Sequence, residues 1–292
     1  MTRRDFVKQA AVGAGVAAVV GSASSGLGQA QPDTALPEIE LGNFKVSRLV
    51  LGSNPFFGFS HYSDELSREM VEYYTDERIC EVLDEAASHG ITAVAAPSYE
   101  RWIKLYGKYR DQGGKLRTWL AQPDRPVAEM QDDIRAAVDG GANAVFVQGA
   151  RVEEAYGDGK LDKLGEWVEL IRGLGVPAGL ASHRPDIHPE VEKAGLPTSF
   201  YYQCFYVPDG DWRDGDPPHA VETIRKIEKP VIGYKILAAG RRNAEEAFRF
   251  ALESIKPIDG VCVGMFPKHD PEQIAKNAEL ARRFSQTDVA AG

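Results

Sequence analysis

Apolar residues follow two alternating patterns along the chain from about residue 47 onward. Short segments such as SRLVLGSN (47–54), with the apolar run Leu49–Leu51 at its centre, and ITAVAA (91–96) are typical of parallel strands covered on both faces. Each run precedes a segment with apolar residues three and four positions apart, the spacing of one helix face. In DERICEVLDEAASHG (76–90) this face consists of Ile79, Val82, Leu83 and Ala86. The pattern predicts alternating strands and helices.

Eight strand–helix units fit into about 240 residues, which favours a (β/α)8 barrel over a doubly wound sheet. The segment IELGNFKVS (39–47) precedes the first of these strands and is expected to form a β-hairpin that closes the bottom of the barrel. We predict one α/β domain, a single (β/α)8 TIM barrel over residues 38–286. A linker (31–37) would precede it and a disordered tail (287–292) would follow it.

The first thirty residues have the pattern of an export signal. A charged start, MTRRDFVK, is followed by the apolar run AAVGAGVAAVV and by small residues ending in Gly28-Gln29-Ala30. The pair Arg3-Arg4 resembles a twin-arginine (Tat) signal. The run is too short and too rich in Gly and Ala for a stable membrane anchor. We expect the Tat machinery to export the protein to a periplasmic or extracellular location, and residues 1–30 to be cleaved off.

Charge and cysteine content exclude several classes of partner. The formal net charge is −9, and removal of residues 1–30 would make the chain more acidic, because that segment is basic. An acidic surface argues against nucleic acid as a partner and leaves a small-molecule substrate as the expectation. Cys80, Cys204 and Cys262 are widely spaced, which fits neither a disulfide framework nor a zinc ribbon.

In a (β/α)8 barrel the active site lies at the carboxyl ends of the strands. The polar residues predicted there include Asn54, Tyr99, Glu100, Trp102, Gln122, Asp124, Gln148, Ser182, His183, Arg184, Gln203, Lys235 and Lys268. The stretch Tyr99-Glu100-Arg101-Trp102 suits sugar recognition by stacking and hydrogen bonds, with Glu100 as a possible acid or base. Its alternative interpretation is the start of an amphipathic helix with a local ion pair.

Lys235 lies inside the apolar run VIGYKILAA (231–239), where a charge is costly unless it is paired or neutralised. A desolvated lysine can form a Schiff base or act as a base, whereas the structural alternative is an ion pair with Asp124. His183 is the best placed histidine, whereas His188, five residues later, is expected to face solvent from the following helix. No HxH or HExxH spacing accompanies His183, so no metal site is predicted.

Several stretches resemble aldo-keto reductases, in order along nearly the whole chain. They are VSRLVLGSNPFFG (46–58), GLASHRPDIHPEVE (179–192), YYQCFYVP (201–208), YKILAAG (234–240) and VGMFPKHDPEQIAKNAELA (263–281). The resemblance implies hydride transfer between NADPH and a carbonyl group, catalysed by an Asp, a Tyr, a Lys and a His. Carried over by position, these four fall at Ala95, at Glu100 with Tyr99 beside it, at Gln122 and at Gln148.

The resemblance also implies a cofactor site. Ser182 and Gln203 match positions that hold the nicotinamide, and Lys268 and Asn277 are available for the phosphates of NADP. An exported enzyme would have to hold NADP tightly, because free NADPH is not expected outside the cytoplasm.

Three hypotheses follow. The first is an oxidoreductase with a non-standard site, acting on a small carbonyl or hydroxyl compound such as a sugar. Its catalytic residues would be Tyr99, Glu100, His183 and Lys235. Its substrate would contact Asn54, Trp102, Gln122, Asp124, Gln148 and Arg184. The second is a cofactor-independent lyase, isomerase or aldolase that uses Lys235 and Glu100. The third is a binding protein without catalysis.

Overall fold

The computed structural model describes residues 35–157, 161–207, 212–213 and 216–285. The chain divides into two units, Met1–Asp33 and Thr34–Gly292, and the described residues belong to the second. The predicted signal (1–30), most of the linker and the predicted tail therefore lie outside the described residues. Within the described part, no helix is long and apolar enough to cross a membrane.

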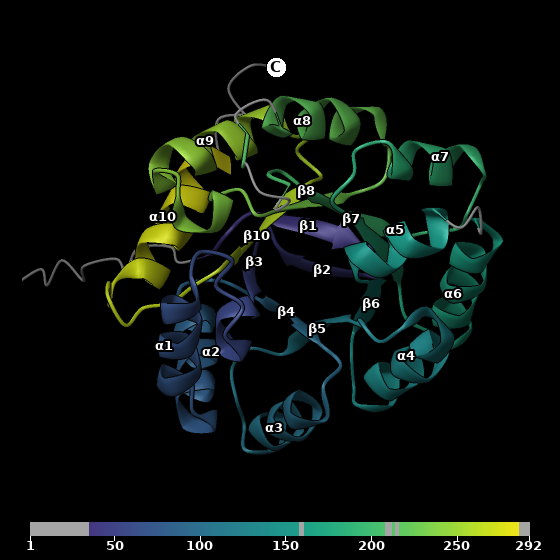
Figure 1. Ribbon diagram of the computed structural model, residues 1–292. Helices are drawn as coiled ribbons and strands as arrows, with labels where there is room; N and C mark the ends of the chain where they lie inside the picture. Colours follow the sequence, from purple (N-terminus) through teal and green to yellow (C-terminus); the bar gives the residue numbers. More distant parts are fainter. Residues whose placement is uncertain (1–34, 158–160, 208–211, 214–215, 286–292) are drawn as a thin grey trace, which may run out of the picture. The chain divides into compact units, whose positions relative to one another are not determined.

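Eight parallel strands form a closed barrel, as the sequence pattern predicted (Figure 1). Around the barrel they follow one another in chain order, and the last strand pairs with the first. They are β3 (Leu49–Gly52), β4 (Ala93–Pro97), β5 (Thr118–Gln122), β6 (Ala144–Val147), β7 (Ala178–Ser182), β8 (Phe200–Cys204), β9 (Val231–Tyr234) and β10 (Gly260–Gly264).

Helices form a ring outside the barrel (Figure 1). They are α1 (Asp64–Tyr73), α2 (Asp76–Ser88), α3 (Glu100–Asp111), α4 (Met130–Asp139), α5 (Gly149–Gly157), α6 (Leu161–Gly173), α7 (Ile187–Lys193), α8 (Asp216–Lys226), α9 (Ala244–Ser254) and α10 (Gln273–Ser285). The predicted apolar face of α2 is buried. Its first turn is capped by Thr75, whose side chain accepts a hydrogen bond from the Arg78 amide.

The predicted hairpin is present. Strands β1 (Glu38–Leu41) and β2 (Phe44–Ser47) pair antiparallel, and their buried residues Ile39, Leu41 and Val46 belong to the same apolar cluster as the barrel interior. Gly42 turns the chain at φ 69°, and a Cβ there would lie 2.8 Å from the side chain of Pro177, just before β7. The hairpin therefore covers the end of the barrel at which the strands begin.

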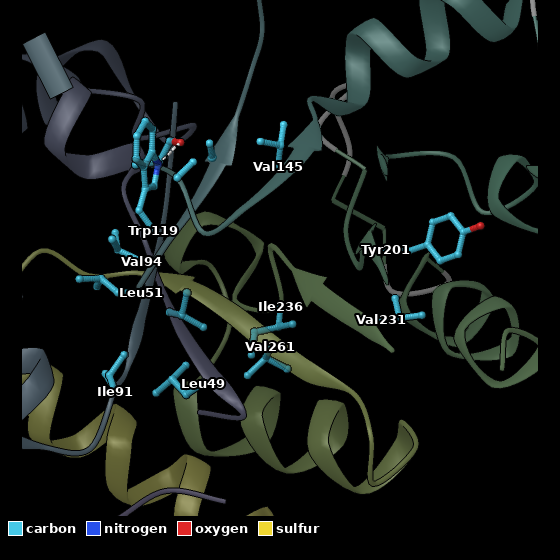
Figure 2. Packing of buried hydrophobic residues seen from close by; sticks show 14 of the residues in the cluster. Leu49, Leu51, Ile91, Val94, Trp119, Val145, Tyr201, Val231, Ile236 and Val261 are labelled. Carbon is cyan, nitrogen blue, oxygen red and sulfur yellow. Dashed lines mark hydrogen bonds between the residues drawn. The ribbon is translucent and has the colours of Figure 1, made fainter. Parts of the chain in front are cut away.

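Strand alternation sorts the core into two clusters. Leu49, Leu51, Val94 and Trp119 point outward and pack beneath the helices (Figure 2). Their neighbours Val50, Ala95 and Leu120 point into the barrel. The same alternation decides which polar residues at the ends of the strands reach the barrel interior.

Candidate functional site

A cavity of about 350 Å³ opens at the carboxyl ends of the strands. Its floor is formed by inward-pointing residues of four alternate strands, which are Ala95, Phe146, Tyr202 and Cys262. Its walls come from the loops after β3, β9 and β10. Size and position are those of a small-molecule site in this fold.

Three side chains form a connected chain that opens into this cavity. The Glu153 Oε1 atom on α5 lies 3.1 Å from His183 Nδ1, just after β7. The Nε2 atom of the same ring lies 3.3 Å from Lys235 Nζ, which follows β9 and lines the cavity. We call Glu153, His183 and Lys235 the relay. It joins residues on α5, just after β7 and just after β9, which are far apart in sequence.

Glu153 fixes the orientation of the His183 ring. Burial would raise the pKa of Glu153, but hydrogen bonds from His183 and Ser182 outweigh it and hold that pKa below its usual value. The ionised carboxylate only accepts, so Nδ1 of His183 donates to it. In neutral imidazole the Nε2 lone pair then faces Lys235, and this nitrogen can accept a proton from the Lys235 ammonium group.

Backbone strain is concentrated around the cavity. Among the described residues, five that are not glycine have positive φ, and three of them, His61, Lys235 and Ala239, line the cavity. Such conformations cost about 1–3 kcal/mol each and are found mainly at functional sites. Gly149 opens α5 beside the relay, and a Cβ there would lie 3.1 Å from His183 Nδ1.

His61 adds a second imidazole at the mouth of the cavity. Its Nε2 atom lies 3.4 Å from Asn54 Nδ2, and Arg241 donates a hydrogen bond of 3.0 Å to the His61 carbonyl. Partial burial, and then the nearby Lys235 and His183, lower the pKa of His61 to about 4. His61 is therefore neutral at pH 7. Asn54, predicted as a substrate contact, lines the cavity.

A second polar cluster lies at the ends of β4 and β5. The Tyr99 hydroxyl donates to Asp124 Oδ2 at 2.6 Å, and the Ser98 hydroxyl donates to Asp133 Oδ1 at 2.6 Å. Asp133 also accepts from the amide of Asp124. Neither Tyr99 nor Asp124 lines the cavity. The predicted alternative partner of Lys235 was Asp124, but the structure pairs Lys235 with His183 instead.

The structure corrects two predicted site residues. Glu100 begins α3 on the outer ring, and its exposed carboxylate is paired with Lys104 one turn later. Trp102 is fully buried among Phe56, Tyr106 and Trp119, where no substrate can stack on it. The alternative interpretation, an amphipathic helix with a local ion pair, describes this stretch.

The four residues that the resemblance assigned to NADP do not line the cavity. Ser182 and Gln203 share strand faces with Leu180 and Tyr201, which point outward, so alternation turns both away from the barrel interior. Lys268 is paired with Glu69 at 2.7 Å, and Asn277 is 3% exposed within α10.

Of three further residues that were predicted to contact substrate, only one lines the cavity. Gln122, at the end of β5, points inward and lines the cavity. Gln148 caps the start of α5, where its Oε1 accepts a hydrogen bond of 3.2 Å from the Arg151 amide. Arg184 is exposed and paired with Asp186. Neither Gln148 nor Arg184 lines the cavity.

Two site residues were missed, and one histidine was misplaced. Glu153 lies within a helix, four residues from its start, so the search of strand ends passed over it. Tyr202 was predicted only as part of an apolar strand. Side chains alternate along a strand, and Tyr201 points outward, so the side chain of Tyr202 points into the barrel. His188 was expected to face solvent, but it is fully buried and its Nε2 lies 3.0 Å from the Tyr202 carbonyl oxygen.

Comparisons with known proteins give matches among solved structures. No family model and no curated protein matches the chain. A structure from Pseudomonas aeruginosa, provisionally described as an aldo-keto reductase, shares 16% identity at a TM-score of 0.60, covering 88% of this chain and 99% of its own. A truncated 3-deoxy-D-arabino-heptulosonate 7-phosphate synthase from Thermotoga maritima shares 13% at 0.56, with coverage of 88% and 94%.

The similarity is to (β/α)8 barrels that are described under different activities. It shows the fold. An N-acetylneuraminic acid synthetase from Leptospira borgpetersenii is also similar, with 14% identity, a TM-score of 0.55 and coverage of 87% and 90%. Because this fold carries many chemistries, activity has to be argued from the site itself. Within the described part of the chain, no group of three or more His, Cys, Asp or Glu side chains could hold a metal ion.

Proposed function

We propose that the chain is an enzyme that transforms a small carbonyl compound through the amine of Lys235, as a lyase, aldolase or isomerase. The observation that carries this proposal is the relay, in which Glu153 orients His183 and His183 contacts Lys235 at the cavity wall. This deepens the second sequence hypothesis and replaces Glu100 with His183 as the acid–base partner.

The relay supplies the proton transfers that Schiff-base formation requires. His183 Nε2 accepts a proton from the Lys235 ammonium, and the neutral amine forms a bond to the carbonyl carbon. The proton returns to the former carbonyl oxygen, giving a carbinolamine. This oxygen takes a second proton from the bonded nitrogen and leaves as water, so that a protonated imine forms. The protonated imine then draws electrons from a neighbouring bond, so that a proton or a carbon fragment can be released.

A trapping experiment tests this proposal. The protein is incubated with glycolaldehyde, dihydroxyacetone or pyruvate in the presence of cyanoborohydride, and the modified lysines are located by peptide mass mapping. We expect Lys235 to be modified ahead of the other lysines. Lys229 is a matched control, since it is also partly buried and contacts a carboxylate, at 2.6 Å from Glu192. Equal modification of Lys235 and Lys229 would reject the proposal.

NADP-linked oxidoreduction is the second candidate, because the cavity runs from the barrel interior along the loops after β9 and β10 to Gln273 at the start of α10. The resemblance places the cofactor in this direction. Against it, Lys268 is engaged by Glu69, and the carboxylate of Asp270 lines the cavity. Purified protein is denatured, and the supernatant is examined for nucleotide absorbance at 260 and 340 nm. Release of stoichiometric NADP would favour this candidate over the lyase.

Export is proposed from the sequence of residues 1–30 alone. Replacing Arg3 and Arg4 together by lysine should stop Tat-dependent export, and a reporter fused after residue 37 would then stay in the cytoplasm. Export that continues in the double variant would contradict a Tat signal.

A further inference from the structure

The floor of the cavity includes one phenol, the side chain of Tyr202. Tyr202 is 2% exposed, and its ring stacks on Phe146 with centroids 3.8 Å apart and an interplanar angle of 4°. Among the described residues the hydroxyl has no hydrogen-bond partner, although the side chain lines the cavity. A buried hydroxyl without a partner destabilises the fold, and a phenylalanine would stack equally well. A ligand in the cavity can supply the missing partner.

The surroundings of this hydroxyl limit the chemistry of that ligand. The cavity-lining residues that can carry charge are His61, Lys235, His269 and Asp270, and all four belong to the loops after β3, β9 and β10. Beside Tyr202 the floor consists of Ala95, Phe146 and Cys262. Burial raises the pKa of the Cys262 thiol to about 12, so the thiol is neutral at pH 7. A carboxylate or phosphate placed there would lose its hydration, and none of the three residues that form the floor with Tyr202 carries a positive charge.

We propose that Tyr202 is a specificity-determining residue that hydrogen-bonds a neutral hydroxyl group of the substrate. The substrate class is then a hydroxylated carbonyl compound of the sugar type, which enters the barrel with a hydroxyl end first. Lys235 at the cavity wall receives its carbonyl group. The carbonyl part rests on the proposed function, whereas the hydroxyl contact rests on the geometry of the floor alone.

The test is binding of a polyol that has no carbonyl group and cannot react with Lys235. Erythritol is titrated at millimolar concentration into wild-type protein and Tyr202→Phe, and binding is measured calorimetrically. We expect the affinity to fall about three- to tenfold in the variant, as for loss of one neutral hydrogen bond. The unfolding temperature of unliganded Tyr202→Phe should equal or exceed that of the wild type, because the unpartnered hydroxyl has been removed.

Tyr106→Phe is the matched control. It removes a hydroxyl that is also buried but lies outside the cavity, where it donates to the Leu116 carbonyl at 3.3 Å. Erythritol affinity should be unchanged in Tyr106→Phe. Wild-type protein that does not bind erythritol, or Tyr202→Phe that binds it as well as the wild type, would overturn the proposal. Failure of the proposed function would instead leave erythritol binding intact while Lys235 is not trapped.

Discussion

Two groups of polar residues lie at the ends of the barrel strands, and they differ in whether they reach the cavity. The Tyr99–Asp124 cluster after β4 and β5 is closed, because the phenol donates to the carboxylate and neither group lines the cavity. The relay after β7 and β9 includes Lys235, which lines the cavity. A polar residue at a strand end is thus a candidate for chemistry only when its outermost atom reaches the cavity.

Backbone conformation separates the two groups as well. Lys235 has φ 58°, in the left-handed region that residues with side chains seldom occupy, whereas Tyr99 has φ −64° and simply precedes α3. Strain of this kind persists where the surrounding structure enforces it, and at catalytic sites it often aims a side chain. The comparison therefore fits a stabilising role for the closed cluster and supports the chemical role that we propose for the relay.

The largest effect is expected from Lys235→Met. This change removes the nucleophile and keeps a similar side-chain length, so turnover of any carbonyl substrate should fall at least a thousandfold. Kinetics with a hydroxylated carbonyl substrate provide the measurement, and Lys229→Met is the control that should keep its rate. Residual turnover within tenfold of wild type would remove Lys235 from the mechanism.

A smaller effect is expected from Glu153→Gln, which keeps the shape but removes the charge that orients His183. The rate should fall about ten- to a hundredfold. Because the pKa of Glu153 is lowered in the folded protein, its stabilising contribution is present above pH 4.5 and is lost as the pH falls through the folded value. Chemical denaturation should show a difference of about 1–2 kcal/mol between wild type and variant at pH 7 that shrinks toward pH 3. A difference that does not change with pH would contradict this role.

Tyr99→Phe tests the other side of the comparison. It leaves the half-buried Asp124 without its phenol donor, so we expect a loss of about 1–2 kcal/mol in unfolding free energy. Trapping at Lys235 should stay within twofold of wild type. If trapping fell at least tenfold while the fold stayed intact, the closed cluster would belong to the active site after all.

The smallest effect is a shift in the titration of His61. Histidine ring resonances in NMR spectra should show His61 titrating at about pH 4 in the wild type. In Lys235→Met this pKa should rise, because a nearby cation is removed. It should stay below the ordinary value, because burial is the larger cause. No change in the variant would show that Lys235 does not approach His61.

The sequence predicted the architecture because hydrophobic periodicity reports it directly. Strands buried on both faces and amphipathic helices alternate eight times, and the hairpin, the barrel and the buried face of α2 were all predicted from this pattern. Local spacing was sufficient to predict the individual strands and helices, and their number and order then indicated the barrel.

The candidate site was predicted only in part, because it depends on which way each side chain points and on contacts between residues far apart in sequence. His183, Lys235, Asn54 and Gln122 were placed near the cavity by the strand-end rule alone. Glu153 was missed because its partner lies thirty residues later in sequence, on another element. Ser182 and Gln203 were assigned by resemblance, although one-residue alternation turns both outward.

The central claim is that His183 activates Lys235 toward a carbonyl group. Its most direct test is the site-resolved extent of cyanoborohydride trapping at Lys235 in wild type and in His183→Asn, measured against Lys229 in the same sample. The account predicts preferential modification of Lys235 in the wild type and a decrease of at least tenfold in the variant, with Lys229 unchanged. Equal modification of Lys235 in both proteins would contradict it.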